Sequence, residues 1–170
     1  LPLGQVAQFE ETHNEANGEN NRDGHNENIS YNHGVEGETD DEEVLLNREY
    51  TSKALLASLF LSNGTPMLLA GDEFGNSQQG NNNSYCQDNP INGWIGKMNL
   101  MVVKFTQELI RVRSQIKLLT DDCWWKKERV QWLNADSSPM TEYCWHNRGS
   151  KAIQIVLDDE WLLLVNAKRS

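Results

Sequence analysis

The chain has 170 residues, enough for one ordinary domain with a sizeable core. Its net charge of −10 argues against nucleic acid and anionic membranes as partners. Three cysteines without a Cys-x-x-Cys motif predict a reducing, cytoplasmic compartment, and no apolar run approaches the roughly 18 residues of a membrane span.

Residues 1–38 are predicted to form a loop rich in asparagine and glycine. Their first nine residues lack the charged start and long apolar stretch of a signal peptide. Too few apolar side chains lie between His13 and Gly37 to offset the entropy of ordering the backbone, so a neighbour must hold this loop or it stays mobile. Residues 1–43 carry twelve of the 25 acidic residues and a single basic residue, Arg22, which indicates a solvated face.

A helix is predicted to begin near Thr39, because Thr39-Asp40-Asp41-Glu42 has the form of a capping box. Its buried face is predicted from the three-to-four spacing of Tyr50, Ala54, Ala57 and Leu61. Ser62-Asn63-Gly64 ends the helix, with Gly64 free to turn left-handed. The apolar run Met67–Ala70 then predicts a strand of a parallel sheet that helices cover on both faces.

Gly64–Asn89 is the most informative stretch, because two carboxylates and a loop of eight amide side chains directly follow the predicted strand. This order is the one that a barrel enzyme needs in order to bind a sugar at the ends of its strands. The two carboxylates are Asp72 and Glu73. Neighbours on an extended strand point to opposite faces, so this pair is not expected to bracket one bond.

A second helix is predicted over about Asn99–Leu118, with its apolar stripe at Val102, Phe105, Leu109, Val112 and Ile116. After Leu119 the chain becomes β-prone and contains five of the six tryptophans. The β-prone residues include Trp124, Trp125, Val130, Trp132, Tyr143 and Trp145. Ala152–Leu157 and Trp161–Val165 predict a hairpin. The aromatic set is interpreted as the core of a small sheet, with a sugar platform as the alternative.

Metal binding is not expected from the histidines, although His13, His25 and His33 lie among acidic residues. Their spacing matches no compact set of ligands, and no calcium loop of the D-x-[DN]-x-[DN]-G type occurs. We therefore expect no metal and no cofactor. Cys86 has no neighbouring base and is predicted to be a packing residue rather than a nucleophile.

Several segments resemble one enzyme family. His13–Gly24, HNEANGENNRDG, is similar to the segment after the seventh barrel strand of bacterial glycogen debranching enzymes, in the isoamylase branch of the α-amylase superfamily. Gly34–Gly37 resembles the next landmark of the family, and Gly64–Asn89 resembles its eighth strand and following loop. A further set of residues resembles the start of the family's β-sandwich domain: Trp124-Trp125, Val130, Trp132-Leu133 and Asn166-Ala167. The resemblance covers about residues 13–167.

The resemblance implies an α/β part followed by a β part. Residues 1–118 would be the last strand and flanking helices of a (β/α)₈ catalytic barrel, with 1–38 as its Asn-rich loop. Residues 119–170 would be the opening strands of a β-sandwich domain. A complete barrel needs roughly 250 residues, so this chain would hold only a piece of one.

The activity implied by the resemblance is hydrolysis of α-1,6 branch links in glycogen or limit dextrin, with retention of configuration. Three carboxylates carry it in the family: an Asp nucleophile, a Glu acid/base and an Asp that orients the sugar. All three precede the segment that begins at His13, and residues 1–12 contain no His-Asp pair. We therefore expect no catalytic residue in this chain and no activity of the chain alone.

The same resemblance implies that a glucan contacts the amide loop and the neighbouring barrel mouth. The predicted substrate-binding residues are Asp72, Glu73, Asn81, Asn82, Asn83, Tyr85, Gln87, Asp88, His13, Asn14 and Glu15. Hydrogen bonds to sugar hydroxyls and stacking on Tyr85 would hold the ligand. Structural interpretations stay open: the carboxylates cap a turn or accept backbone N–H groups, the amides hold their own loop, and His13 to Glu15 pin the Asn-rich loop.

The expected partners are an α-glucan, such as glycogen or limit dextrin, and an N-terminal part of the enzyme. Nucleic acid and membranes are not expected. Two alternatives to a piece of a hydrolase remain: a non-enzymatic glucan-binding or assembly module, and a degenerate remnant without a role.

Overall fold

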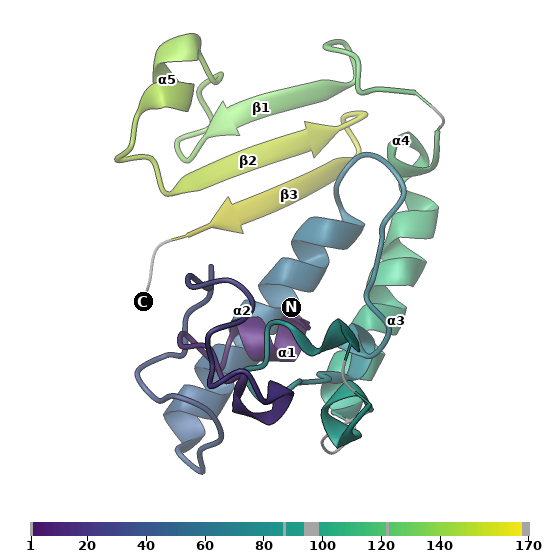
Figure 1. The fold of residues 1–170 in the computed structure, drawn as a ribbon. Coiled ribbons are helices and arrows are strands. Elements are labelled where there is room, and N and C mark those ends of the chain that lie inside the picture. The colour runs from purple at the N-terminus through teal and green to yellow at the C-terminus, as the bar shows by residue number, and fades with distance from the viewer. Residues whose placement is uncertain (1, 87, 94–98, 122, 168–170) are drawn as a thin grey trace. The chain divides into compact units, whose positions relative to one another are not determined.

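The computed structural model describes residues 2–86, 88–93, 99–121 and 123–167. The chain divides into two compact units, Leu1–Val112 and Arg113–Ser170. The first unit consists of helices joined by long loops, and the second contains an antiparallel sheet (Figure 1). No helix among the described residues combines the length and the apolar character needed to cross a membrane.

The predicted loop over residues 1–38 contains two short helices and is held in place by the rest of its unit. These are α1 (Leu3–Val6) and the 3₁₀ turn η1 (Glu15–Asn17). Tyr31 N donates to Val6 O at 3.0 Å, and Gly37 N donates to Gln8 O at 2.9 Å. These hydrogen bonds fold the loop back on α1 and satisfy its backbone polar groups, in place of the apolar core that the loop lacks.

Helix α2 (Glu42–Phe60) begins later than the predicted capping box, and its N-cap is Asp41. The Asp41 carboxylate accepts hydrogen bonds from Glu43 N at 2.9 Å and Val44 N at 3.1 Å. The Thr39 hydroxyl accepts only from Asp41 N, before the helix begins. A carboxylate suits the positive end of the helix dipole better than a hydroxyl does. At the other end Gly64 has a φ of +102°, as predicted.

The predicted face of α2 is wrong at Tyr50, which is 61% exposed, and at Ala54, which is exposed, whereas Ala57 packs against the core. Leu56 and Phe60 are buried instead, one turn apart, against Val102 and Leu109 of α3 (Leu100–Gln115). Apolar residues occur on several sides of α2, so its sequence does not define one stripe. The stripe predicted for α3 is confirmed at Val102 and Leu109, although the helix ends at Gln115.

Met67–Ala70 forms no strand, contrary to the prediction. Met67 is 86% exposed and Leu69 is 50% exposed, while Leu68 packs against the core of Leu56, Phe60, Val102 and Leu109. A strand requires a neighbour with which to exchange backbone hydrogen bonds. The described part of the first unit contains no such strand. The remaining turns of this unit are η2 (Asp72–Phe74), η3 (Ser84–Cys86) and η4 (Pro90–Asn92).

The second unit contains a three-stranded antiparallel sheet in the order β1-β2-β3, visible in Figure 1. Its elements are α4 (Lys117–Thr120), β1 (Val130–Asn134), α5 (Glu142–His146), β2 (Ala152–Leu157) and β3 (Trp161–Asn166). The predicted hairpin is confirmed, with Leu157 opposite Trp161 and a turn in which Asp158 and Asp159 have positive φ.

Two β-prone aromatics, Tyr143 and Trp145, lie on helix α5 rather than on a strand. Thr141 caps this helix by accepting a hydrogen bond from Cys144 N, which overrides the strand propensity of the aromatic rings. Trp132 of β1 contacts Trp125 and Trp145, with ring centroids 5.9 and 5.4 Å away.

Candidate functional site

Two loops far apart in sequence are joined by asparagine side chains in the first unit. Asn14 Nδ2 donates to Asn82 Oδ1 at 2.8 Å, and Asn82 N donates to Asn14 Oδ1 at 2.9 Å. Asn82 Nδ2 in turn donates to His25 O and to Asn28 Oδ1. Asn14 is fully buried. These bonds join the Asn-rich loop to the segment that follows η2, here called the amide loop (residues 76–89), at Asn82.

A second layer of the same network surrounds Asp23. Its Oδ2 atom accepts hydrogen bonds from Asn17 Nδ2 at 2.7 Å and from Asn83 Nδ2 at 2.8 Å. These two bonds lower the pKa of the Asp23 carboxyl. Asn81 Nδ2 donates to Asn17 Oδ1, and Asn81 Oδ1 accepts from Asn83 N. Asn81 is fully buried, so its side chain makes hydrogen bonds within the network and is not available to a ligand.

Gln5 of α1 links this network to the first helix. Its Oε1 atom accepts from Gln78 N at 3.1 Å, and its Nε2 atom donates to Asn81 O at 3.1 Å. The side chain is fully buried. Both the oxygen and the nitrogen of the Gln5 side-chain amide bind the backbone of the amide loop. Helix α1 therefore supports residues 78–81.

Glu36 anchors the other side of the Asn-rich loop. Its carboxylate accepts hydrogen bonds from Glu10 N, Glu11 N, Asn32 Nδ2 and the His13 ring, at 2.9 to 3.0 Å. Burial of the carboxyl opposes ionisation, but the hydrogen bonds outweigh it and lower the pKa of Glu36 to about 2. Arg48 of α2 binds the same loop by donating to the carbonyls of Asn32, Val35 and Gly37.

The predicted carboxylate pair lies on the turn η2 rather than on a strand, and its two members are bound separately. Asp72 Oδ1 accepts from Leu3 N at 2.6 Å, and Glu73 Oε2 accepts from Gly71 N at 2.9 Å. Burial raises the pKa of Asp72 despite the bond from Leu3 N. Both carboxylates accept backbone N–H groups, as the structural interpretation of this pair predicts.

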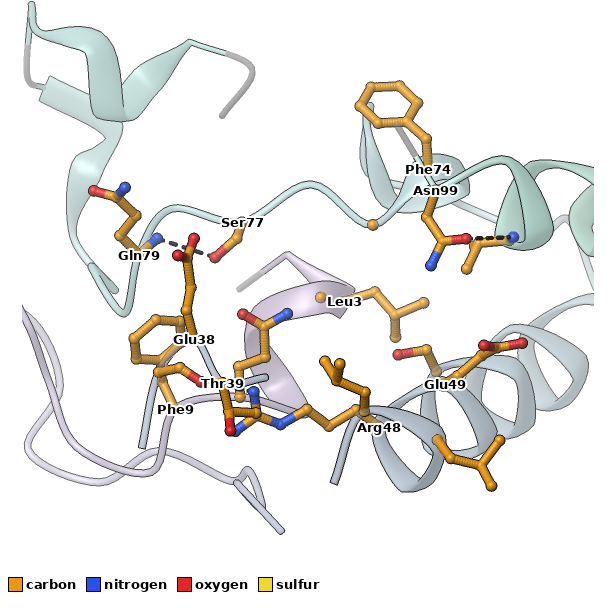
Figure 2. Close-up of a pocket in the computed structure, with 18 of the residues that line it drawn as sticks. Leu3, Phe9, Glu38, Thr39, Arg48, Glu49, Phe74, Ser77, Gln79 and Asn99 are labelled. Carbon is orange, nitrogen blue, oxygen red and sulfur yellow. Dashed lines mark hydrogen bonds between the residues drawn. The ribbon is translucent and has the colours of Figure 1, made fainter. Parts of the chain in front are cut away.

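Asp72 also lines a pocket of about 970 Å³ in the first unit, between α1, the first half of α2 and the loop after η2 (Figure 2). Figure 2 shows Leu3, Arg48 and Phe74 among the side chains around it. Four further carboxylates line this pocket: Glu38, Asp40, Glu42 and Glu49. Arg48, which donates to backbone carbonyls, and Lys53, which pairs with Glu49, offset part of this charge and leave a net negative lining. The pocket is therefore suited to a neutral or cationic group rather than to an anion.

Three of the other predicted site residues are exposed and, within the part of the chain that the structure describes, make no side-chain hydrogen bond to the network. Tyr85 is 85% exposed, and Asp88 and Glu15 are exposed. The side chain of His13 is 35% exposed, and its ring packs edge-on against Phe9. Gln87 lies outside the described residues. The structure thus brings His13 and Asn14 together with Asn81–Asn83, and leaves Tyr85 as the projecting aromatic ring of the amide loop.

Donor and acceptor counts separate the asparagines into two kinds. Asn82 uses its side-chain oxygen and both amide protons within the network, and Asn81 is fully buried. Asn83 Oδ1 makes no hydrogen bond within the described part of the chain, and its side chain is half-buried. The chemistry left at the surface is an amide oxygen, a carboxylate and a phenol ring, which suits hydrogen bonding and stacking with a polyhydroxylated ring.

Residues of the network that were not predicted as site residues from the sequence include Gln5, Asn17, Asp23 and Arg48. The requirement that a neighbour must hold the Asn-rich loop predicted that such partners exist but not which residues they are. Among the described residues, no group of three His, Cys, Asp or Glu side chains gathers as metal ligands would. The histidines instead serve loop contacts, such as the 3.1 Å hydrogen bond between His33 and Thr51.

Known proteins resemble the chain throughout its length. Residues 126–170 match the family model of the glycogen debranching enzyme C-terminal domain. The "glycogen operon protein GlgX homolog" of Haemophilus influenzae is 52% identical over 174 aligned positions, which cover 98% of this chain and 26% of that protein. A glycogen debranching enzyme of Enterobacter sp. (strain 638) is 50% identical over 94% of this chain, and one of Dickeya chrysanthemi is 51% identical over 94%.

The chain spans about a quarter of the length of these curated relatives, between 24% and 26%. Identity near 50% over almost the whole chain covers the Asn-rich loop, the amide loop and the second unit alike. The resemblance to bacterial glycogen debranching enzymes, and to their C-terminal domain over residues 126–170, is therefore confirmed.

Proposed function

We propose that this chain, a relative of the C-terminal part of bacterial glycogen debranching enzymes, acts in glycogen breakdown as one wall of a glucan-binding site. The observation that carries this proposal is the amide network, which holds Asn83 at the surface, on the loop that also carries the exposed Tyr85 and Asp88. In this proposal the first unit is a piece of a catalytic barrel. The whole activity is hydrolysis of α-1,6 branch links.

In this proposal Tyr85 supplies the main contact with the sugar. Tyr85 is 85% exposed and lies two residues after Asn83, whose backbone the network holds, so a glucose ring can reach its ring and stack on it. Asn83 Oδ1 and the Asp88 carboxylate accept hydrogen bonds from sugar hydroxyls. The ligand is not contacted by Asn14, Asn81 or Asn82 in this proposal. These three residues fix the backbone of the loop by hydrogen bonds.

We further propose that the chain alone does not cleave the bond. Hydrolysis with retention needs two carboxyl groups roughly 5–5.5 Å apart on either side of the glycosidic bond. Asp72 faces the pocket while bound to Leu3 N, whereas Glu73 is bound to Gly71 N and is not among the residues that line the pocket. Asp72 and Glu73 therefore make poor substitutes for an acid and nucleophile pair.

The test of these proposals is made with the purified chain. Incubation with phosphorylase limit dextrin is expected to release no reducing ends above a blank, and any release would contradict the proposed inactivity. Co-sedimentation with glycogen is expected to retain the wild-type chain, and Tyr85→Ala is expected to abolish retention. The matched control is Tyr50→Ala, because Tyr50 is an exposed tyrosine of α2 outside the amide loop.

A second candidate function, assembly with the remaining part of such an enzyme, is favoured by the exposed run at Met67 and Leu69. Apolar side chains exposed side by side usually mark a contact surface. We expect Met67→Ser with Leu69→Ser to abolish binding to the other three quarters of a relative in a pull-down assay. Glycogen retention of the isolated chain should not change in this double variant, because neither side chain belongs to the amide loop.

A further inference from the structure

We infer that Asp23 is a positioning residue that fixes the Asn83 amide so that its oxygen faces a sugar hydroxyl. This inference rests on the proposed function, because it assigns a task within the same glucan-binding surface. Asp23 itself does not touch the ligand in this account. It acts through the side chain of Asn83.

The direction of the Asn83 amide follows from the chemistry of Asp23. An ionised carboxylate only accepts hydrogen bonds, so the group that Asn83 turns toward it must be the NH₂. The contact between Asn83 Nδ2 and Asp23 Oδ2 is 2.8 Å. The low pKa of the Asp23 carboxyl keeps this preference at any neutral or mildly acidic pH. The amide oxygen of Asn83 is therefore directed away from Asp23.

The backbone of Asn83 is held as firmly as its side chain. Asn83 N donates to Asn81 Oδ1 at 2.9 Å, and Asn83 O accepts from Asn17 Nδ2 at 3.2 Å. Asn17 also donates to Asp23 Oδ2 at 2.7 Å, so one amide fixes both partners. Rotation of the Asn83 side chain would break the bond to Asp23 and leave a charged oxygen without that donor.

The asparagine beside Asn83 shows why Asp23 determines specificity. The side-chain oxygen of Asn82 accepts a hydrogen bond from Asn14, whereas Asn83 Oδ1 is unpartnered among the described residues. Asp23 thus makes Asn83 an acceptor site, which selects a neutral ligand with hydroxyl donors. An anionic ligand would meet both the amide oxygen and the charge of Asp23 behind it.

A reversal of the pair tests this arrangement. In Asn83→Asp a second carboxylate faces Asp23, the donor is lost, and the two charges repel, so glycogen affinity is expected to fall roughly tenfold or more. Combining it with Asp23→Asn removes the repulsion between the two carboxylates, and we expect part of the lost affinity to return. Recovery is expected to be incomplete, because Asp23 Oδ2 accepts from both Asn17 and Asn83, and a single amide atom at that place cannot both accept from Asn17 and donate to position 83. The control is Glu27→Gln, an exposed acid of the same loop.

Glycogen affinity of the Asp23→Asn/Asn83→Asp double variant no higher than that of Asn83→Asp, with a melting temperature near wild type, would overturn the inference. Wild-type affinity in Asn83→Asp would overturn it as well. If glycogen does not retain the wild-type chain at all, the proposed function fails instead. The pairing is then decided by NMR: the Asn83 side-chain NH₂ signals should shift in Asp23→Asn and not in Glu27→Gln, and unshifted signals contradict the pairing.

Discussion

The backbone of Gly80 lies directly against the imidazole ring of His13. His13 N donates to Gly80 O at 3.1 Å, and a Cβ atom built on Gly80 would lie 2.4 Å from His13 Cδ2. The same Cβ would lie 2.8 Å from Phe9 Cδ1. The Asn-rich loop and the amide loop therefore meet at a point where no side chain fits, just before the asparagines of the site.

Gly80→Ala is expected to destabilise the first unit by roughly 3 kcal/mol or more, because both the contact and the backbone conformation oppose the new methyl group. The control is Gly64→Ala. Gly64 also has positive φ, at +102°, but a Cβ there would meet no atom within 4 Å. That control should cost about 1 kcal/mol from backbone strain alone. Urea titration measures the free energy of unfolding of both variants. Equal decreases in Gly80→Ala and Gly64→Ala would contradict the close contact at Gly80.

Asn14→Ala is expected to lower the free energy of unfolding by roughly 2–4 kcal/mol. The substitution removes three side-chain hydrogen bonds, to Asp23 O, Asn82 Oδ1 and Asn82 N, at a fully buried position. The control is Glu15→Ala, at the exposed neighbouring position, which should change the free energy of unfolding by less than about 0.5 kcal/mol. Denaturant titration followed by tryptophan fluorescence or circular dichroism checks the pair, and a neutral Asn14→Ala would show that the network contributes little.

The lowered pKa of Glu36 predicts that the protein loses stability in acid. The folded pKa of this carboxyl, about 2, lies below the ordinary value of 4.5, so Glu36 stabilises the fold while ionised above that value. As pH falls from about 4.5 to about 2 the unfolded chain takes up a proton first, and this contribution disappears. Glu36→Gln should be less stable than wild type at pH 6, and the difference should shrink toward pH 2. Melting curves at several pH values test this, and a pH-independent difference would contradict it.

The sequence was sufficient for elements whose pattern points to one answer. Helix α3 has a single apolar stripe, and the β2–β3 hairpin has two β-prone apolar runs joined by a turn of acidic residues. Helix α2 could not be oriented in this way, because Leu45, Leu46 and Leu55 add apolar residues on other sides. Met67–Ala70 has the composition of a buried strand, yet strand formation depends on a partner that composition does not supply.

The candidate site was predictable in composition but not in detail. A loop crowded with amides indicates hydrogen bonding to polar ligands, and the family resemblance indicated a glucan. Which amide faces outward depends on pairings across more than fifty residues, such as Asn14 with Asn82 and Asp23 with Asn83. Asn81, Asn82 and Asn83 are indistinguishable as neighbours in sequence. Only their different partners separate buried supports from an available acceptor.

The orientation of α2 is tested by a matched pair of truncations on that helix. Leu56 is 1% exposed and packs in the core with Phe60, Val102 and Leu109, so Leu56→Ala should cost roughly 2–5 kcal/mol. Tyr50 lies on the face predicted from sequence but is 61% exposed, so Tyr50→Ala should cost less than about 1 kcal/mol. Urea titration of the two variants compares the faces directly. A larger loss for Tyr50→Ala than for Leu56→Ala would restore the face predicted from spacing, because burial is what makes truncation costly.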